Sequence, residues 1–400
     1  MDAVNATSTR TTPSRPSRGL VLGCGGTLGA AWTIAALHAL RRATDFDPRE
    51  ADVLVGTSAG AEVAALLGGG VGVEELLAAQ LGRPDARPEL LRHFATPPRA
   101  LPPRPAAFLG SPGLARRTLR GTAPALAGLT GLLPQGRGDA RWLAALADSL
   151  TPAGQWIPHP ATWLVATDFD TGRRTVFGHP DTRPAALRDA LRASWAVPGW
   201  FPPVRVAGRR YADGGILSTA SADLLVPSGL DEVYVVAPMS SRAPGPRRGL
   251  GRAEALLRRV MPRTLDAECA ALRATGTRVV RIEPGPADLE VMGGNFMGPR
   301  RRLTVLESAL RTTRAHVREA LREADDDETG SGIRTGTEAR AGAATGAGTG
   351  AEAGTATEAA TEAEAEAGTG AGAEAEADGQ APGGAARAAA PTTDARPTGA

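Results

Sequence analysis

Two short apolar segments, each running through a glycine-rich turn into a helical pattern, constrain the fold of this chain more than any other feature. The first unit spans residues 19–42 and turns at Cys24–Gly29, and the second spans residues 51–67 and turns at Gly56–Gly60. Strand–turn–helix units in succession are typical of parallel strands connected by helices. We therefore predict an α/β protein built around a parallel sheet.

The remaining pattern extends this sheet. Alternating or continuous apolar runs predict further strands at 162–167, 174–177, 209–212, 232–237 and 278–282. Helical spacing predicts further helices at 73–81, 139–150, 184–194 and 303–324. Residues 84–105, rich in proline and arginine, are predicted to be irregular, and the stretch after them to Leu133 is weakly helical. Such an insertion forms either a cap or substrate groove, or an ordinary surface loop.

Both ends of the chain differ in composition from the body. Residues 325–400 are mostly Ala, Gly, Thr and Glu and contain almost no large apolar side chain. They cannot bury enough surface to offset the entropy of ordering, so we predict a disordered acidic tail. The polar segment 1–18, with two prolines, is predicted to be disordered as well. The globular body then comprises roughly 300 residues, enough for one sizeable core.

Charge is distributed unevenly between body and tail. The tail holds 14 acidic residues and four arginines, a net charge of −10. Because the whole chain has a net charge of +2, the rest of the chain carries +12, and all of the positive charge comes from arginine. This excess reflects either a solvated surface or attraction to anionic surfaces such as lipid headgroups.

Targeting signals and membrane spans are not expected. No apolar run reaches the ~18 residues of a transmembrane helix, and the N-terminus lacks a signal-peptide pattern. Cys24 and Cys269 are too few for a disulfide framework. We expect a cytoplasmic protein that contacts membranes peripherally and does not bind nucleic acid.

The strongest chemical signal is Gly56-Thr57-Ser58-Ala59-Gly60, which has the form G-x-S-x-G between a predicted strand and helix. A nucleophilic Ser needs a sharp, strained turn to project its hydroxyl above the sheet, and glycines on both sides leave room for that backbone. The helix that follows adds positive dipole potential near the reacting oxygen. We therefore predict that Ser58 is a nucleophile.

A Ser hydroxyl needs a base, and the histidines are poorly placed to supply one. None of the five lies at the end of a predicted strand, where a triad histidine belongs; they are His38, His93, His159, His179 and His316. Asp213, by contrast, directly follows the predicted strand at 209–212 and precedes Gly214 and Gly215. An Asp there can reach a neighbouring residue at the sheet edge, although an ordinary Asp-Gly turn has the same sequence. In combination with Ser58, it is the candidate general base.

A third motif lies between the first strand and first helix, at Gly23-Cys24-Gly25-Gly26-Thr27-Leu28-Gly29. Consecutive glycines let backbone N–H groups point at one place, which suits the oxyanion formed in acyl transfer. A nucleotide loop is a weaker interpretation. A G-x-G-x-x-G pattern begun at Gly23 would need glycine where Leu28 stands, and the chain has no lysine for a P-loop.

These three motifs, in this order, resemble the patatin-like phospholipase family. Ala193–Val204 resembles the segment that precedes the family's Asp-Gly-Gly motif, and Ala222–Leu225 and Pro238–Met239 resemble the segments that follow it. Within the first of these, Trp195, Trp200 and Phe201 are expected to pack in the core rather than to line an acyl groove or dock at a bilayer surface. The resemblance covers about Gly19 to Met239.

The resemblance implies a three-layer α/β/α fold and Ca²⁺-independent hydrolysis of phospholipid or other lipid acyl esters, with no cofactor or metal. It assigns Ser58 as nucleophile, Asp213 as base and the backbone amides of Gly25, Gly26 and Thr27 as the oxyanion hole. The supporting glycines of its motifs are Gly29, Gly56, Gly60, Gly214 and Gly215. It makes 19–240 the catalytic domain and 241–324 an extension of the same body.

Two positions depart from the family pattern. Cys24 stands where the family usually has Gly, and Leu28 where it usually has Arg or Lys. Backbone donors survive a change of side chain, but a lost cation would remove electrostatic help from the site. Three alternatives therefore stay open: a non-catalytic lipid-binding protein of the same fold, a Ser-His-Asp esterase using His316, and a thioesterase or lysophospholipase acting on soluble substrates.

Overall fold

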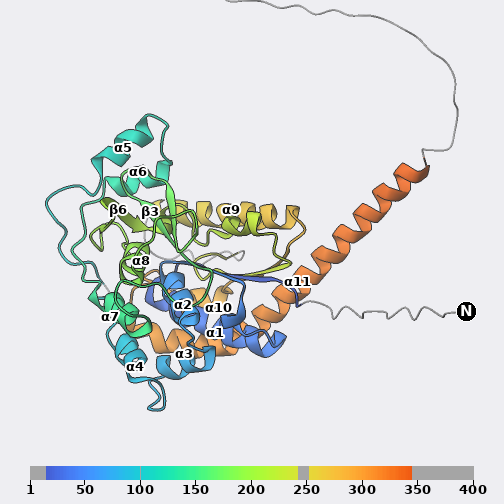
Figure 1. The fold of residues 1–400 in the computed structure, drawn as a ribbon, viewed down its shortest axis with the longest axis horizontal. Coiled ribbons are helices and arrows are strands. Elements are labelled where there is room, and N and C mark those ends of the chain that lie inside the picture. The colour runs from blue at the N-terminus through green and yellow to red at the C-terminus, as the bar shows by residue number, and fades with distance from the viewer. Residues whose placement is uncertain (1–14, 100, 242–251, 345–400) are drawn as a thin grey trace, which may run out of the picture. The chain divides into compact units, whose positions relative to one another are not determined.

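A computed structural model describes residues 15–99, 101–241 and 252–344, with only the backbone for 252–262 and 330–344. It contains an eight-stranded sheet in the order β5-β6-β3-β2-β1-β7-β8, with β4 paired to β3 (Figure 1). The strands are β1 (Arg18–Leu22), β2 (Val53–Thr57), β3 (Thr162–Asp168), β4 (Arg174–Phe177), β5 (Val204–Val206), β6 (Arg209–Asp213), β7 (Glu232–Val236) and β8 (Arg278–Ile282). The pairs from β3 through β2, β1 and β7 to β8 are parallel, whereas β4, β5 and β6 join antiparallel. The predicted α/β class with a mostly parallel sheet is confirmed.

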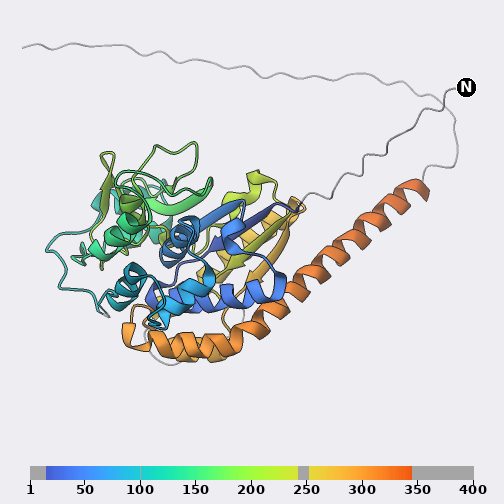
Figure 2. The ribbon, with the colours of Figure 1, turned by 60° about the horizontal axis from the view of Figure 1, so that its bottom comes forward.

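Alternating side chains of the strands fill two apolar cores, one on each face of the sheet. On β1, Leu20 and Leu22 belong to one core and Val21 to the other. The first core is covered by α1 (Gly26–Thr44), α2 (Ala59–Gly68), α3 (Val73–Gln80), α8 (Leu187–Ser194) and α11 (Arg302–Ala344). The second is covered by α9 (Arg252–Ala274) and η3 (Ala222–Ser228). Figure 2 shows α1 between the sheet and α11 on one face, and α9 and η3 cover the other face, so the expected α/β/α layers are present.

Short helices surround the sheet between β2 and β3 and after β8. They are α4 (Pro88–Ala95), α5 (Pro112–Leu119), α6 (Ala125–Gly131), α7 (Arg141–Leu150) and α10 (Pro286–Met292). The prediction that residues 84–105 are irregular is partly wrong, because this stretch contains α4. Pro88 occupies the first turn of that helix, where a missing N–H costs nothing. β5 was not predicted either, because three residues are too few to show a strand pattern.

The first helix begins earlier than its glycines indicated. We expected it from Ala30, but α1 starts at Gly26, inside the glycine-rich run. Gly26 has a φ of +56°, which an L side chain rarely adopts, and the chain turns there directly into the helix. Likewise α2 starts at Ala59 rather than Ala61. Both motifs therefore place their backbone amides at a helix N-terminus.

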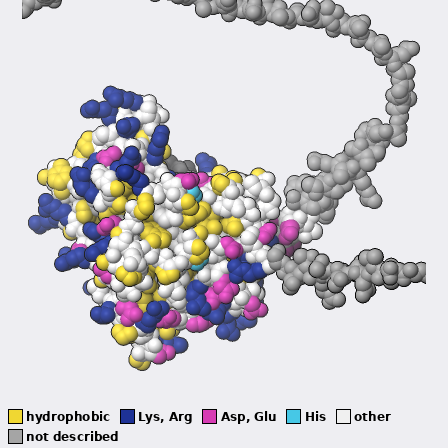
Figure 3. Space-filling view, viewed as in Figure 1, with side chains coloured by type: hydrophobic (Ala, Val, Ile, Leu, Met, Phe, Trp, Pro, Cys, Tyr) yellow, Lys and Arg dark blue, Asp and Glu magenta, His cyan; other side chains and the backbone are white. Residues whose placement is uncertain are grey.

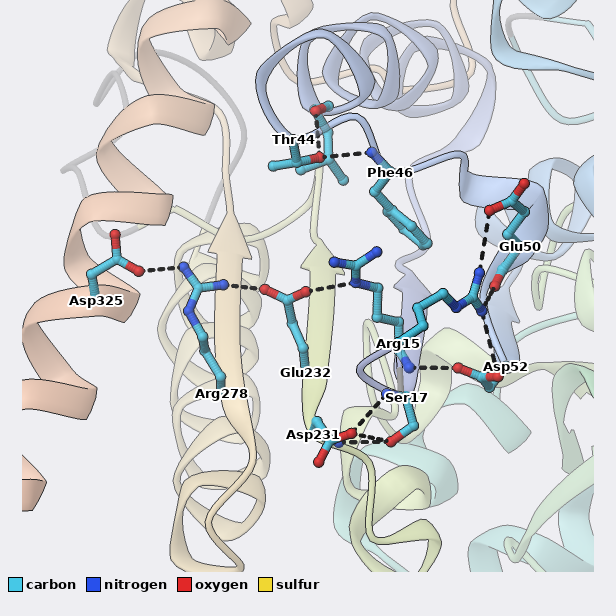
Figure 4. Close-up of polar contacts among 12 residues, drawn as sticks. Arg15, Ser17, Thr44, Phe46, Glu50, Asp52, Asp231, Glu232, Arg278 and Asp325 are labelled. Carbon is cyan, nitrogen blue, oxygen red and sulfur yellow. Dashed lines mark hydrogen bonds and ion pairs between the residues drawn. The ribbon is translucent and has the colours of Figure 1, made fainter. Parts of the chain in front are cut away.

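A ladder of charges joins the starting ends of the parallel strands (Figure 4). Glu232 on β7 pairs with Arg18 of β1 and with Arg278 of β8, and Arg278 also bonds Asp325 on α11 at 2.6 Å. This end of the sheet is opposite to the strand ends that carry the three sequence motifs.

The boundaries predicted for the terminal segments need adjustment. Arg18 is already part of β1, and Ser17 is anchored by its hydroxyl to Asp231 at 2.8 Å. α11 continues past 324 to Ala344, and Arg278 of β8 holds Asp325 of this helix. The predicted disorder of 1–14 and 345–400 lies outside the described residues.

Candidate active site

Ser58 occupies a one-residue turn between the end of β2 and the start of α2. Its φ of 55° and ψ of −118° are strained for a residue with a side chain. Only 3 % of the residue is exposed. A strained serine at a strand-to-helix turn, directly before the N-terminus of the helix, has the geometry of a nucleophile elbow.

The two glycines of the pentapeptide are required by close backbone approach. A Cβ at Gly60 would overlap the carbonyl oxygen of Leu22 on β1, and one at Gly56 would lie 2.5 Å from the carbonyl oxygen of Gly60. The helix therefore passes so close to β1 and β2 that side chains at these positions have no space. This explains the spacing that the sequence motif presents.

Ser194, the last residue of α8, fixes the backbone of the turn. The Ser58 N–H donates to Ser194 Oγ at 2.9 Å, and the Ser194 hydroxyl donates to the Val165 carbonyl at 2.6 Å. Ser194 is fully buried. Ser194 lies within the Ala193–Val204 segment, but sequence alone predicts no role for it. No local signal identifies it, because its partners lie far away in the sequence.

Asp213 is the last residue of β6 and lies beside the Ser58 turn. Its N–H donates to the Ala196 carbonyl at 3.0 Å, and its Oδ1 accepts the Gly215 N–H at 2.7 Å. A Cβ at Gly214 would lie 2.7 Å from the Val165 carbonyl and 3.0 Å from Thr57. Glycine at 214 thus lets the Asp213 turn pack directly against β3 and the residue before Ser58.

The carboxyl group of Asp213 is buried and its proton affinity is increased. Burial raises its pKa to about 6, while the adjacent Ser58 side chain and the Gly215 N–H act in the lowering direction. A carboxylate with a pKa near neutrality, in contact with a hydroxyl, can accept a proton from it.

The glycine-rich loop meets the same turn. Cys24 Sγ would lie 3.2 Å from a Cβ at Gly215, and the Asp213 charge adds to burial in raising the pKa of the Cys24 thiol. The thiol therefore stays protonated and acts as a packing group, as expected for a cysteine in apolar surroundings.

The amides expected for an oxyanion hole are available. Within the described part of the chain, the N–H groups of Gly25, Gly26 and Thr27 donate to no protein acceptor, whereas Leu28 N–H donates to the Phe296 carbonyl at 3.0 Å. The three free amides precede or begin α1, where the helix dipole favours negative charge. The structure thus brings the three motifs together at one end of the sheet.

The histidines are engaged elsewhere. His316 contacts Asp288, and His93 forms a buried pair with Glu62, with 2.8 Å between Nε2 and Oε1. The other three also bond residues outside the Ser58 turn: His38 bonds Glu74, His159 bonds the Ala51 carbonyl and His179 faces Asp181. No histidine is therefore placed to act on Ser58 in this structure.

A cavity of about 860 Å³ opens between α4 and α7. Trp142, Trp200 and Phe201 form its apolar wall, and arginines stand at its margin. A second cavity of about 20 Å³ shares Trp142 with it and is also lined by Thr27, whose buried hydroxyl has no protein partner. The smaller cavity therefore lies between the groove at α4 and α7 and the glycine-rich loop, and neither cavity is lined by Ser58 or Asp213.

Aromatic and apolar residues near the site have packing roles. Trp195 and Phe201 are almost fully buried and pack with Ala59, the residue after Ser58. This agrees with the expected core role of Trp195 and Phe201, although Phe201 also lines the larger cavity. Trp200 packs against the same cluster but is only half-buried and lines that cavity, so the expectation holds only in part for it. Leu28 is fully buried in the main core. A cation at that position would need partners that the apolar core does not supply.

The fold and site together define an α/β protein with a nucleophile elbow, an adjacent buried carboxyl group and a glycine-rich amide loop. The model of the patatin-like phospholipase family matches residues 20–226 of the chain, which therefore belongs to that family. Among solved structures, VipD from Legionella pneumophila is similar at 14% sequence identity and a TM-score of 0.34, over 77% of this chain and 68% of VipD. Family membership makes lipid acyl hydrolysis the expected class of activity.

Proposed function

We propose that this protein is a serine lipid acyl hydrolase in which Ser58 is the nucleophile and Asp213 the general base. The observation that carries the proposal is the placement of the buried Asp213 carboxyl beside the strained Ser58 turn, with its pKa raised to about 6. The carboxyl is ionised at neutral pH, yet it accepts a proton more readily than an exposed aspartate does.

Acylation begins when Asp213 takes the proton of the Ser58 hydroxyl as the oxygen attacks the ester carbonyl. The free amides of Gly25, Gly26 and Thr27 are the donors for the tetrahedral oxyanion. When the intermediate collapses, the carbon–oxygen bond to the lysolipid or other alcohol breaks, and Asp213 returns the proton to that leaving group. The acyl chain remains esterified to Ser58.

Deacylation repeats the steps with water. Asp213 removes a proton from the attacking water, the second oxyanion occupies the same amides, and the fatty acid leaves as Ser58 regains its proton. No metal or cofactor enters the sequence of steps. The substrate is a phospholipid or related lipid ester, reached by peripheral contact of the protein with a membrane.

The cavity between α4 and α7 supports a lipid rather than a small soluble substrate. Its aromatic wall offers apolar surface for an alkyl chain, and its size is that of a ligand pocket. The smaller cavity, which shares Trp142 with this larger one, is lined by Thr27 of the glycine-rich loop.

The test is hydrolysis of phospholipid vesicles and of a short-chain nitrophenyl ester by the wild type, Ser58→Ala, Asp213→Asn and His316→Ala. We expect both substrates to be cleaved, activity to vanish in the first two variants and His316→Ala to retain it. Loss of activity in His316→Ala with retention in Asp213→Asn would favour a Ser-His-Asp esterase. Cleavage of the soluble ester alone would favour a thioesterase or lysophospholipase, and inactivity of the folded wild type a non-catalytic protein.

A further inference from the structure

Residues 101–138, which form α5, α6 and the segments beside them, carry an unusual surface and are called here the α5–α6 lobe. Seven large apolar side chains of this lobe are between 43 % and 89 % exposed. They are Leu101, Phe108, Leu109, Leu119, Leu129, Leu132 and Leu133. Monomeric proteins rarely expose so many large apolar side chains in one region unless the region binds something.

These side chains belong to one compact unit. Ala106 N–H donates to the Gln135 carbonyl at 2.8 Å and Gln135 N–H to the Phe108 carbonyl at 3.0 Å, so Phe108 and Leu109 run beside the Leu132–Gln135 segment. α5 and α6 pack on each other, and the Thr118 hydroxyl donates to the Pro124 carbonyl at 3.1 Å between them. The exposed leucines therefore lie on neighbouring segments of a single lobe.

The lobe is also uniformly basic. It contains five arginines and no acidic residue. The arginines are Arg104, Arg116, Arg117, Arg120 and Arg137, and all are exposed. In the described part of the chain, none of the five forms an ion pair. Figure 3 shows arginine and hydrophobic side chains intermingled over the part of the molecule where Figure 1 draws α5 and α6.

The base of the lobe is joined to the candidate site. Leu114 of α5 and Ala127 of α6 share a small core with Ala212 and Ile216, the residues that flank Asp213-Gly214-Gly215. Arg210 of β6 donates to the Gly110 carbonyl at 3.0 Å. Arg137 also lines the margin of the 860 Å³ cavity. The lobe is thus attached directly to the turn of the proposed base, and its last segment reaches the lining of the cavity.

We propose that the α5–α6 lobe docks on anionic lipid bilayers, inserting its leucines and Phe108 at the interface while its arginines bind acidic headgroups. Apolar side chains surrounded by arginine match the two components of an anionic membrane surface, the acyl boundary and the negative headgroups. A second copy of this chain is a poorer occupant, because two lobes of the same positive charge repel each other. The choice of lipid as partner rests on the proposed function. The docking proposal adds which part of the protein contacts the bilayer and which charge the headgroups carry.

Docking is tested by sedimentation with vesicles of phosphatidylcholine alone or mixed with phosphatidylglycerol, using full-length Ser58→Ala protein so that lipid stays intact. We expect at least tenfold tighter binding to the anionic vesicles, weakened by added salt. Arg116→Gln/Arg117→Gln should lower the affinity by roughly 30-fold, on the basis of the usual contribution of a basic residue near such a surface. Leu119→Ser/Leu129→Ser should lower it at least tenfold.

Matched controls lie on α11, away from the lobe. Arg311→Gln/Arg314→Gln removes the same charge from exposed positions, and Leu303→Ser removes a leucine that is 44 % exposed. Each control should bind within about twofold of the parent. Equal losses of vesicle affinity in the lobe and control variants would overturn the proposal. So would equal affinity for neutral and anionic vesicles, or lobe variants that change only self-association in analytical ultracentrifugation.

Hydrolysis of a soluble short-chain ester separates this proposal from the proposed function. With Ser58 restored, the lobe variants should cleave that ester at the wild-type rate and lose activity only on anionic vesicles. A wild type that binds vesicles through the lobe but cleaves neither substrate would refute the hydrolase assignment and leave docking intact. If the wild type is active and the lobe substitutions do not change the rate of vesicle hydrolysis, docking alone would be refuted.

Discussion

The backbone N–H of Ser58 donates to the hydroxyl oxygen of Ser194 at 2.9 Å, across 136 residues of sequence. The Ser194 hydroxyl in turn donates to the Val165 carbonyl, so one buried side chain joins the Ser58 turn to β3. A strained turn persists only where its surroundings fix it. We regard this contact as the main restraint on the conformation of Ser58.

Ser194→Ala should therefore affect both stability and turnover. It leaves the Ser58 N–H without a buried acceptor, which we expect to lower the free energy of unfolding by about 1–3 kcal/mol. kcat for a soluble ester should fall at least tenfold, because the nucleophile loses its fixed position. Thr329→Val is the control, since its hydroxyl bonds the Asp325 carbonyl on its own helix and it lies outside both cavities. Urea unfolding and ester kinetics measure both effects, and wild-type kcat in Ser194→Ala would contradict the positioning role.

Gly60→Ala should destabilise the fold severely. The added Cβ overlaps the Leu22 carbonyl, and neither the strand nor the helix can move without disturbing the core. We expect a loss of more than about 3 kcal/mol or failure to fold. In Gly113→Ala the Cβ meets nothing within 4 Å, so this variant should match or slightly exceed the wild type in thermal unfolding. Equal melting temperatures for the two variants would disprove the close approach of α2 to β1.

The pH dependence of kcat/KM should follow ionisation of Asp213. A protonated carboxyl cannot take the Ser58 proton, so activity should fall as pH drops through about 6, the raised pKa of this group. The measurement is kcat/KM from pH 4.5 to 8 with an ester that does not ionise in that range. A profile that stays flat down to pH 5 would be inconsistent with Asp213 as the base.

The same raised pKa predicts a gain of stability on neutralising Asp213. Its folded-state pKa exceeds the ordinary value of 3.8, so burying the charge opposes folding, fully above about pH 6 and not at all below about pH 4. Asp213→Asn should therefore raise the free energy of unfolding by up to about 3 kcal/mol at pH 7.5, and by about half as much at pH 5. Denaturation at the two pH values tests this, and a gain independent of pH would argue against a buried charge.

Much of the fold followed from sequence because each signal was local. Strand–glycine–helix patterns marked β1, β2 and their helices, and the motifs around Ser58 and Asp213 were found from residue order alone. The helix boundary at Gly26 was misplaced because glycine usually breaks helices, whereas here Gly26 adopts a φ of +56° that turns the chain directly into α1. The pairing of Asp213 with Ser58 was a hypothesis that only the antiparallel β3–β6 pairing makes geometrically reasonable.

Other features depend on tertiary contacts and left no local signal. Ser194 acts through partners on β2 and β3, and α4 forms despite the prolines near it because its apolar side faces the core. The α5–α6 lobe looked like a cap or a loop in sequence. Its function can be argued only once the exposure of its leucines is known, because sequence does not distinguish an exposed leucine from a buried one.

Reaction with a fluorophosphonate probe tests the central assignment most directly, because the reagent modifies only an activated serine. The account predicts stoichiometric labelling of the wild type, with the mass of the adduct on the peptide that contains Ser58. Ser58→Ala should show no labelling, and Asp213→Asn should show much slower labelling while remaining folded. Failure of the folded wild type to label, or an adduct on another residue, would contradict the assignment of Ser58 as the nucleophile.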